Sequence, residues 1–461
     1  MFYSSITITT EKVGLIMNIP ENKIQESKEE KRARHAWYAY DFGNSAYASI
    51  ILLAVFSAYF KGVVVGGAEG TRLWGIAVGV AAIVVAILSP ILGAIADVAR
   101  SKKLFLGIFT AISIAFTAAL FFVGPGDVAM AMVFFILAEI GYRGAQVFYD
   151  ALLVDVSTPE TVGNISGKGW AIGMLGGIVT LVLVLVPMQL VGEAFKPNHA
   201  FLITAFVFLV SSIPTFLYVK EKHEVVEQMP FGKSIKDAFQ KLADTFKEIR
   251  TYKEFLRYMF AFLIYNDGIM MLMDFAAIIG GTLFGLGTIE LLLFVILIHI
   301  TGAIGALLFG RIADRYSSKI SVIYSLLILI VSLACLYFVG DSKVAFFIIG
   351  AFAGFSLSGA QSVSRSMTSQ LAPPDKMTEF YGFLSVAGRT STFVGPLVFS
   401  TLAYRMNNYY ENIGWATEAA EKGGQYWGIG SIIFFLLVGL VILFTVREVT
   451  ASNPMIYPDS Q

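Results

Sequence analysis

The chain has 461 residues, of which 56% are hydrophobic and 14% are charged, and its 33 basic and 33 acidic side chains give a formal net charge of zero. Average soluble domains carry about 25% charged residues, so this composition excludes a disordered chain and a nucleic-acid-binding protein with a basic surface. The single cysteine, Cys335, excludes a disulfide scaffold and a cysteine-based zinc site, which leaves a polytopic membrane protein.

Long apolar stretches separate the charged segments of the chain. A helix needs about 20 apolar residues to cross about 30 Å of hydrocarbon. On that scale the sequence predicts about twelve transmembrane helices, at residues 37–60, 72–95, 104–123, 128–154, 166–190, 199–219, 255–281, 287–310, 320–339, 344–370, 378–404 and 426–446. The stretches lack the period-2 alternation of β-barrel strands. The expected fold class is therefore an all-α polytopic membrane protein.

The predicted helices divide the chain into five segments. These are an N-terminal tail (1–36), a six-helix half (37–219), a linker (220–253), a second six-helix half (254–446) and a C-terminal tail (447–461). In the linker, apolar residues recur at helical spacing between lysines, which predicts a basic amphipathic helix on the membrane surface or an ordinary solvated connector. We expect no signal peptide, and the sequence leaves open whether translation starts at Met1 or Met17.

Lysine and arginine are distributed unequally between the two sets of loops. They gather in the N-terminal tail, in the loops after the second and eighth predicted helices, and in the linker. Positively charged loops stay on the cytoplasmic side of a membrane. This bias predicts that both termini are cytoplasmic, with the protein in the inner (plasma) membrane of the cell if it is bacterial.

Short motifs recur in the same order in the two halves. The segment 93–97 (GAIAD) closes the second predicted helix and 310–314 (GRIAD) closes the eighth, and basic residues follow each. The tripeptide GAQ occurs at 144–146 and again at 359–361, an offset of 215 residues. Repeats of this kind predict two homologous six-helix halves.

Two such halves joined by a central linker are the layout of the major facilitator superfamily, and the loops after the second and eighth helices resemble its signature loop. The resemblance implies that these loops have a gating role. Glycine permits close approach of two helices, and Asp can cap a helix or pair with Arg. The alternative is a basic loop that only sets topology. The gating candidates are Gly93, Asp97, Arg100, Gly310, Asp314 and Arg315.

The resemblance narrows within residues 37–400. The segment 37–47 (WYAYDFGNSAY) is similar to the W-x-x-Y-D-x-x-N-S-A-Y opening of the Atg22-like transporters, and 148–153 (FYDALL) and 265–268 (YNDG) resemble further motifs of that family. Membership would imply a twelve-helix secondary transporter, and the fungal members are linked to amino-acid efflux from the vacuole. The fourth helix departs from the family pattern by carrying Glu139, Arg143 and Asp150.

Charged side chains within the predicted helices are the candidates for a binding site, because each costs on the order of 3 kcal/mol at membrane depth. On the fourth helix the polar residues follow i, i+4, i+7 and i+11 and so share one face. The candidate substrate- or proton-binding residues are Asp41, Asn44, Glu139, Arg143, Gln146, Asp150, Asn266, Asp267, Asp274, Gln361, Arg365 and Arg389. Most lie on the first and fourth helix of each half, which line the central cavity in the superfamily that the chain resembles.

The charges within this set suggest separate roles. Acidic side chains exceed basic ones, so the site would attract cations or hold protons. We assign Asp41 and Asp267 to proton or ammonium binding, and Arg365 and Arg389 to a substrate carboxylate, which arginine can grip with two hydrogen bonds. Glu139 and Arg143 are one helical turn apart, and are either part of this site or a self-neutralising structural pair.

The sequence therefore predicts a secondary transporter that works by alternating access on a small polar, amino-acid-like or zwitterionic solute. It would be facilitative or coupled to H⁺, and efflux is one direction that the sequence leaves open. We expect a monomer in the lipid bilayer with no catalytic residues, cofactor, metal or nucleic acid. The alternatives are a membrane receptor or sensor that binds a ligand without transport, and a carrier of the same superfamily for a sugar, peptide, drug or cation.

Overall fold

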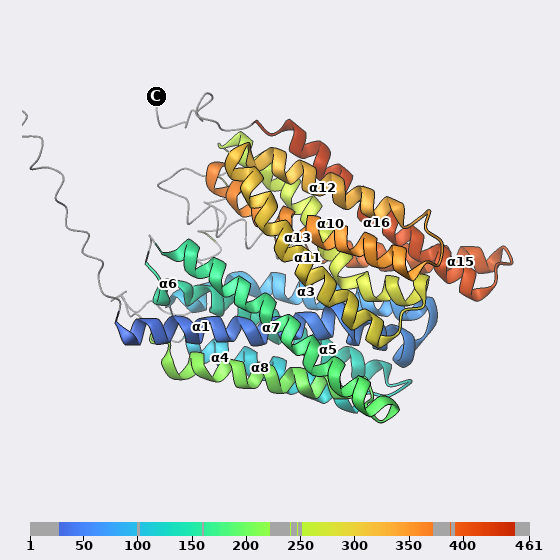
Figure 1. The fold of residues 1–461 in the computed structure, drawn as a ribbon, viewed down its shortest axis with the longest axis horizontal. Helices are drawn as coiled ribbons and strands as arrows, with labels where there is room; N and C mark the ends of the chain where they lie inside the picture. Colours follow the sequence, from blue (N-terminus) through green and yellow to red (C-terminus); the bar gives the residue numbers. More distant parts are fainter. Residues whose placement is uncertain are drawn as a thin grey trace, which may run out of the picture.

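The protein is a bundle of long helices (Figure 1). The structure is a computed structural model that describes residues 27–98, 102–158, 161–221, 240, 247, 251–371, 388 and 392–447. The first part of the chain forms α1 (Lys28–Tyr47), η1 (Ala48–Ala54), α2 (Phe56–Tyr59), η2 (Phe60–Val65), α3 (Gly67–Val98), α4 (Lys102–Ala119), η3 (Leu120–Phe122), α5 (Val128–Ala151), α6 (Leu153–Val156), α7 (Val162–Val191), η4 (Gly192–Ala194) and α8 (Asn198–Tyr218). The second forms α10 (Lys253–Phe284), α11 (Thr288–Arg315), α12 (Ser318–Cys335), α13 (Lys343–Leu371), α15 (Val394–Asn412) and α16 (Thr417–Thr445).

Hydropathy alone locates most of these helices correctly. The described residues contain 11 helices that are long and apolar enough to cross a membrane, and the all-α fold class is confirmed. The helix predicted at 378–404 corresponds to α15, which is described from Val394 and extends to Asn412. The predicted linker helix lies outside the described residues, apart from Gln240 and Lys247, so it stays a prediction.

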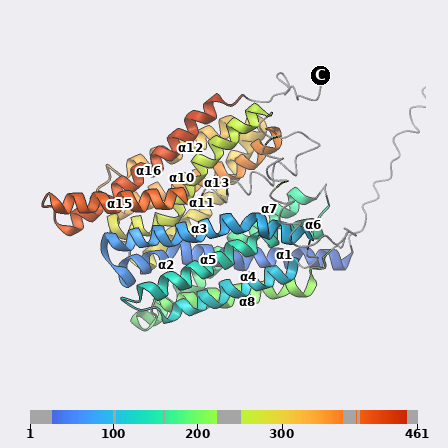
Figure 2. The same cartoon turned by 180° about the vertical axis from the view of Figure 1, so that it is seen from behind.

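The two groups of helices pack in the same pattern (Figures 1 and 2). In the first group α3 packs on α5, α4 on α8 and α1 on α8. In the second group the equivalent pairs are α11 with α13, α12 with α16 and α10 with α16. The internal repeat seen in the sequence is therefore a repeat of packing, and the bundle consists of two homologous halves.

The helices alternate in direction, which gives the bundle two distinct ends. At one end, here called the terminal side, α1 begins and α16 ends, and Lys220 pairs with Glu29 at 2.8 Å. At the other end, the distal side, lie the glycine turns that join α5, α11 and α16 to the helices before them. Gly126, Gly285 and Gly414 adopt positive φ values of 87°, 60° and 94° there, which glycine tolerates without strain.

The first membrane span is not a regular α-helix. Its distal half passes through two π-helical segments, η1 and η2, and the Val55 backbone N–H donates to the Ile50 carbonyl at 2.8 Å. π-Helical turns occur most often at functional positions in helices. The first span therefore combines the α-helical α1 with π-helical turns in its distal half.

Glycine sets how closely several helices approach. At Gly305 on α11 an added methyl group would overlap the backbone carbonyl of Phe355 on α13. Gly310 lies on the same helix, and a methyl group there would meet no atom within 4 Å. The two positions therefore separate the packing role of glycine from its low helix propensity.

We predict that Gly305→Ala lowers the thermal stability of the purified protein while Gly310→Ala does not. Overpacking against a backbone atom costs about 1–3 kcal/mol, whereas an unobstructed glycine-to-alanine change in a helix gains up to about 1 kcal/mol. Thermal unfolding of both variants in detergent measures the difference. Equal melting temperatures for the two variants would contradict the close α11–α13 packing.

Candidate functional site

A cavity of about 390 Å³ lies between the two halves. Its polar lining comes mainly from α1 and from the terminal halves of α5, α7 and α13, and its floor near the bundle centre is formed by Leu53, Met273 and Ile298. Asp150 and Arg365, which line it nearest the terminal side, are exposed. Six of the sequence-predicted residues line this cavity together: Asp41, Asn44, Gln146, Asp150, Gln361 and Arg365.

The cavity contains acidic and basic side chains from opposite halves. Asp41 on α1 is half-buried, and the carboxylate of Asp150 on α5 and the guanidinium of Arg365 on α13 both act on it electrostatically. Asn44, about one turn further along α1, lines the cavity with Asp41. One wall of the cavity therefore carries the carboxylates of Asp41 and Asp150, and the opposite wall carries the guanidinium of Arg365. This arrangement suits a solute that carries both charges.

Aromatic rings form the wall of the cavity beside Asp41. Trp37 stacks on Tyr149 with ring centroids 4.5 Å apart, and its indole N–H donates to the Tyr149 carbonyl at 3.1 Å. Trp170 on α7 also lines the cavity. Rigid stacked rings hold the α1 and α5 backbones at a fixed distance and leave apolar faces for the hydrocarbon part of a solute.

On the distal side the two halves are sealed against each other along α3 and α15 (Figure 2). The Gln425 amide donates to the Thr71 hydroxyl at 2.9 Å, and the Trp74 indole N–H donates to the Asp274 backbone carbonyl at 2.8 Å. A Cβ at Gly79 would lie 2.9 Å from Leu397 Cγ. These contacts bring the helices of different halves together, and we call this contact the distal seam.

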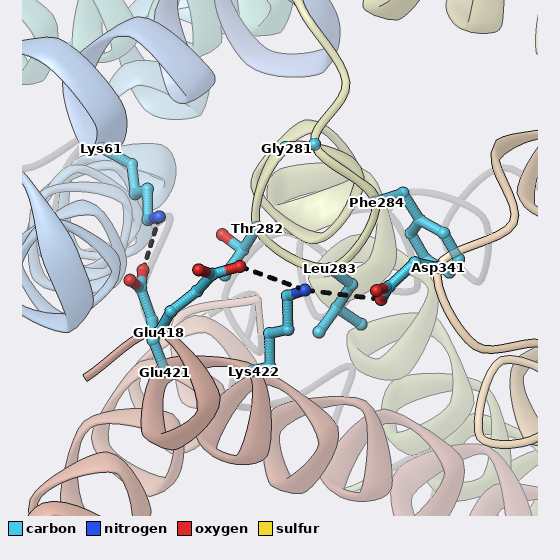
Figure 3. A pocket seen from close by; sticks show the side chains of 10 residues that line it. Lys61, Gly281, Thr282, Leu283, Phe284, Asp341, Glu418, Glu421 and Lys422 are labelled. Atoms are coloured by element: carbon cyan, nitrogen blue, oxygen red, sulfur yellow. Dashed lines mark hydrogen bonds and ion pairs between the residues drawn. The ribbon is translucent and has the colours of Figure 1, made fainter. Parts of the chain in front are cut away.

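A charged pocket of about 350 Å³ lies at the distal end of this seam (Figure 3). Lys61 of the first half pairs with Glu421 of the second at 2.5 Å, and both side chains are only 14% exposed. Lys422 bridges Asp341 and Glu418 at 3.4 and 3.3 Å. The distal pocket and the central cavity share no lining residue, so the distal seam separates them.

Three further predicted residues form a buried group within the seam rather than in the cavity. Arg143 Nε donates to Glu139 Oε1 at 2.5 Å, as their spacing predicts. Asp274, on α10 of the other half, is 2% exposed and acts electrostatically on Arg143. Glu139, Arg143 and Asp274, which we call the seam triad, therefore link α5 of one half to α10 of the other.

The remaining predicted residues lie elsewhere. Asp267 is buried on α10, accepts a hydrogen bond from the Gly395 backbone N–H at 3.0 Å, and does not line the cavity. Asn266 is half-buried on the same helix, and Arg389 lies outside the described residues. The roles assigned to these side chains stay predictions.

The predicted gating loops are only partly described. Gly93 and Asp97 belong to the end of α3, where the side chains are not described, and Arg100 lies outside the described residues. At the end of α11, Gly310 is half-buried, while Asp314 and Arg315 are exposed. The gating role of both loops stays a prediction.

Several cavity residues were not proposed as site residues from the sequence. All are uncharged at neutral pH except His299, whose charge depends on protonation. They are Trp37, Tyr142, Tyr149, Trp170, Met273 and His299. His299 accepts from or donates to Ser49 of the other half at 3.3 Å, and its second ring nitrogen bonds the Val295 carbonyl at 2.8 Å. Two of these residues could have been identified from their place in the sequence. Trp37 precedes Asp41 by one helical turn and Tyr149 is next to Asp150, so both lie beside residues that were already candidates.

Two homologous helical halves around a central polar cavity define a membrane transporter of the major facilitator type. Solved structures share this fold. A bacterial homolog of the human lysosomal transporter Spinster, in an inward-facing and unoccupied conformation, superposes with a TM-score of 0.70 at 14% identity, over 91% of this chain and 97% of that one. A D-xylose–proton symporter superposes with a TM-score of 0.61 at 14% identity, over 92% and 98% of the two chains.

The chain belongs to the family described as vacuole effluxer Atg22 like, whose model matches residues 73–161 and 156–413. The uncharacterized MFS-type transporter YxiO of Bacillus subtilis is 27% identical over 92% of this chain and 96% of its own length. Autophagy-related protein 22 of Yarrowia lipolytica is 24% identical over 53% of this chain and 46% of its own length. The family resemblance seen in the sequence is thereby confirmed.

The distal seam predicts a specific cross-link. In a Cys335→Ser background, Gly79→Cys combined with Leu397→Cys should form a disulfide under mild oxidation, because the two side chains meet in the seam and bridged Cβ atoms lie about 3.5–4.5 Å apart. With a protease site inserted in the linker, the halves should then migrate together on a non-reducing gel.

The matched control pairs Gly79→Cys with Val441→Cys, whose side chain is 62% exposed on the outer surface of α16. That pair should not cross-link. Equal yields for the two pairs would show that α3 and α15 do not form the sealed contact described above.

Proposed function

We propose that this protein is a secondary transporter that moves a small zwitterionic, amino-acid-like solute by alternating access. The observation that carries the proposal is the placement of Asp41 and Arg365 on opposite walls of one cavity between the halves. The transporter class itself follows from the family. The solute class is inferred from the cavity's charges, and the family description as effluxer supports export as the direction.

The chemistry of the cavity supports a zwitterion over a neutral or singly charged solute. Asp41 and Asp150 offer carboxylates to an ammonium group, and Arg365 offers parallel N–H donors to a carboxylate. Asn44, Gln146 and Gln361 add neutral donors and acceptors. A sugar carrier would use mainly the neutral groups, and a polyanion carrier would need more than one arginine.

The asymmetry between the two ends of the bundle supports alternating access. The cavity reaches the terminal side while the distal seam is closed, which is one of the two end states such a mechanism needs. The opposite state would open the seam at α3 and α15 and close the terminal ends of α1, α5 and α13. We propose that the terminal side is cytoplasmic, as the lysine and arginine bias predicts, and that a monomer suffices.

We predict that a thermal-shift screen of amino acids, peptides, sugars and cations finds stabilisation by zwitterions, and that the same solute exchanges across proteoliposomes. Asp41→Asn and Arg365→Lys should each weaken its apparent affinity by about 10–100-fold, since a hydrogen bond to a charged group is worth about 1.5–3 kcal/mol. Lysine keeps the charge of Arg365 but loses the two-pronged geometry.

Glu411→Gln is the control, because Glu411 is exposed beyond the cavity and the distal pocket. It should transport like the unmodified protein. Stabilisation by a zwitterion without flux would favour the receptor alternative. Transport of a sugar with unchanged affinity in both cavity variants would contradict the proposed solute class.

We predict side-specific chemical labelling of the cavity in a Cys335→Ser background. Ser45→Cys lines the cavity, so a membrane-impermeant maleimide should label it in inside-out vesicles. Ser342→Cys, an exposed position on the distal side, should be labelled in intact cells instead. Labelling of both cysteines from the same side would contradict the proposed opening, and reversal of both would contradict the proposed orientation.

A further inference from the structure

A second pocket, of about 70 Å³, lies behind the floor of the central cavity, and every residue that lines it is apolar. Four residues line both spaces: Leu53, Met273, Ile298 and Leu357. The central cavity and this apolar pocket therefore share a wall. Met273 is part of that wall, and the flexible, unbranched side chain of methionine adapts its shape to a neighbouring group. A solute in the cavity can thus extend past the floor into the apolar pocket.

The distal end of the apolar pocket is closed by packed aromatic rings. Phe294 of α11 and Phe346 of α13 line it and stack with ring centroids 4.5 Å apart. The Phe284 ring packs on Phe346, also at 4.5 Å. Phe294 and Phe346 are only 3% and 4% exposed. Packed, buried rings form a rigid wall, so the apolar pocket is a blind extension with a fixed depth.

An empty apolar space inside a packed half of the protein is costly. Interiors are close-packed, and a void lowers stability in proportion to its volume. Apolar voids of this kind stay dry and bind apolar molecules. All the lining residues except Leu53 belong to the second half, so movement of one half against the other would leave the space intact. The apolar pocket therefore has the properties of a site for a hydrocarbon group.

Helix α13 runs along both spaces and gives their separation. Its segment 358–365 contributes polar lining to the central cavity, and its segment 346–357 lines the apolar pocket. From Arg365 to Ala353 the helix rises by about 18 Å. The Arg365 side chain covers part of this distance, because helical side chains tilt toward the helix N-terminus. Two extended residues span about 7 Å, so a single small amino acid held by Arg365 would end short of the apolar pocket.

We propose that the apolar pocket is a subsite of the central cavity for a hydrocarbon chain. The transported solute is then an amphiphile, with a zwitterionic head and an apolar chain longer than the side chain of any standard apolar amino acid. This inference rests on the proposed function, which places the zwitterionic head at Asp41 and Arg365. The head lies between the two halves, and the end of the chain lies inside the second half.

The volume of the apolar pocket determines how much of the chain it holds. An apolar cavity of about 150 Å³ accommodates benzene, so on the same scale about 70 Å³ holds about three methylene groups. Each buried methylene group strengthens binding about fourfold. Filling the pocket should therefore strengthen binding by about 60-fold in total. Longer chains would meet the rings of Phe294 and Phe346 and gain nothing more.

The experiment measures the binding of zwitterions that differ only in chain length. Straight-chain 2-amino acids, from 2-aminobutyrate through norleucine to 2-aminodecanoate, are titrated calorimetrically into the full-length protein in lipid nanodiscs. Titration into empty nanodiscs corrects for partition into lipid. Once the chain is long enough to enter the apolar pocket, the affinity should rise about fourfold per methylene group over about three groups, and then level off or fall.

Two variants change the size of the apolar pocket in opposite directions. Ala276→Leu places a larger apolar side chain in it, so the rise with chain length should vanish while the short-chain members bind as before. Leu272→Ala enlarges it, so the rise should continue to longer chains. Ala115→Leu is the matched control, because Ala115 is exposed on α4, and it should give the same series as the unmodified protein.

An affinity that does not change with chain length would overturn the hydrocarbon subsite and leave the pocket as a packing void or a site for a lipid chain. An unchanged rise in Ala276→Leu would overturn it as well. Should Ala276→Leu fail to fold, the series in Leu272→Ala decides the question alone.

The same titrations separate this inference from the proposed function. Arg365→Lys should weaken every member of the series by the same factor, because distant groups contribute independently. A series without chain-length dependence that still weakens in Arg365→Lys would leave the proposed function standing and overturn only the subsite. A rise with chain length that Arg365→Lys does not affect would support the subsite and contradict the zwitterionic solute. Absence of binding by any member would overturn both.

Discussion

The structure depends on one constraint, which is that each charge kept at membrane depth must find compensation inside the protein. The chain meets it with Arg143 beside Glu139 at 2.5 Å and with Asp274 supplied by the opposite half. Compensation of this kind across an interface makes the position of the halves and the charge state of the interface mutually dependent. A static bundle would be more stable with apolar residues at the same places.

Glycine and serine residues allow close packing in the seam, and their positions distinguish contacts between the halves from contacts within one half. On α7, Gly169 and Gly173 accommodate Trp37 and Asp41 of α1 within the same half. On α3, Gly75 and Gly79 accommodate Ser400 and Leu397 of the other half. Identical small-residue spacing in the sequence therefore serves a contact within one half on α7 and a contact between the halves on α3. The two kinds of contact differ only in the helix that packs against the glycines, and the sequence does not predict which helix that is.

The sequence predicted the membrane helices and their repeat because hydrophobic length and charge placement are local properties. It placed α8 within one residue of its described ends, and the span formed by α4 and η3 within two. It missed the π-helical turns of the first span, since Ala48–Ala54 contains no glycine or proline that would mark an irregular helix. It assigned Asp41 and Asp267 a common role, yet Asp41 faces the cavity and Asp267 faces the Gly395 N–H. Helical spacing predicts which residues share a face of one helix, but it does not predict which other helix packs against that face.

The polar stripe of α5 shows how one helix face serves two sites. Glu139, Arg143, Gln146 and Asp150 share that face, but only Gln146 and Asp150 line the cavity. The two pairs differ in their position along α5. Near the terminal end of α5 the cavity separates the two halves of the protein, whereas near its distal end the two halves are in contact. One continuous stripe thus contributes two polar side chains to the cavity and two to the buried contact between the halves, although helical spacing in the sequence marks all four alike.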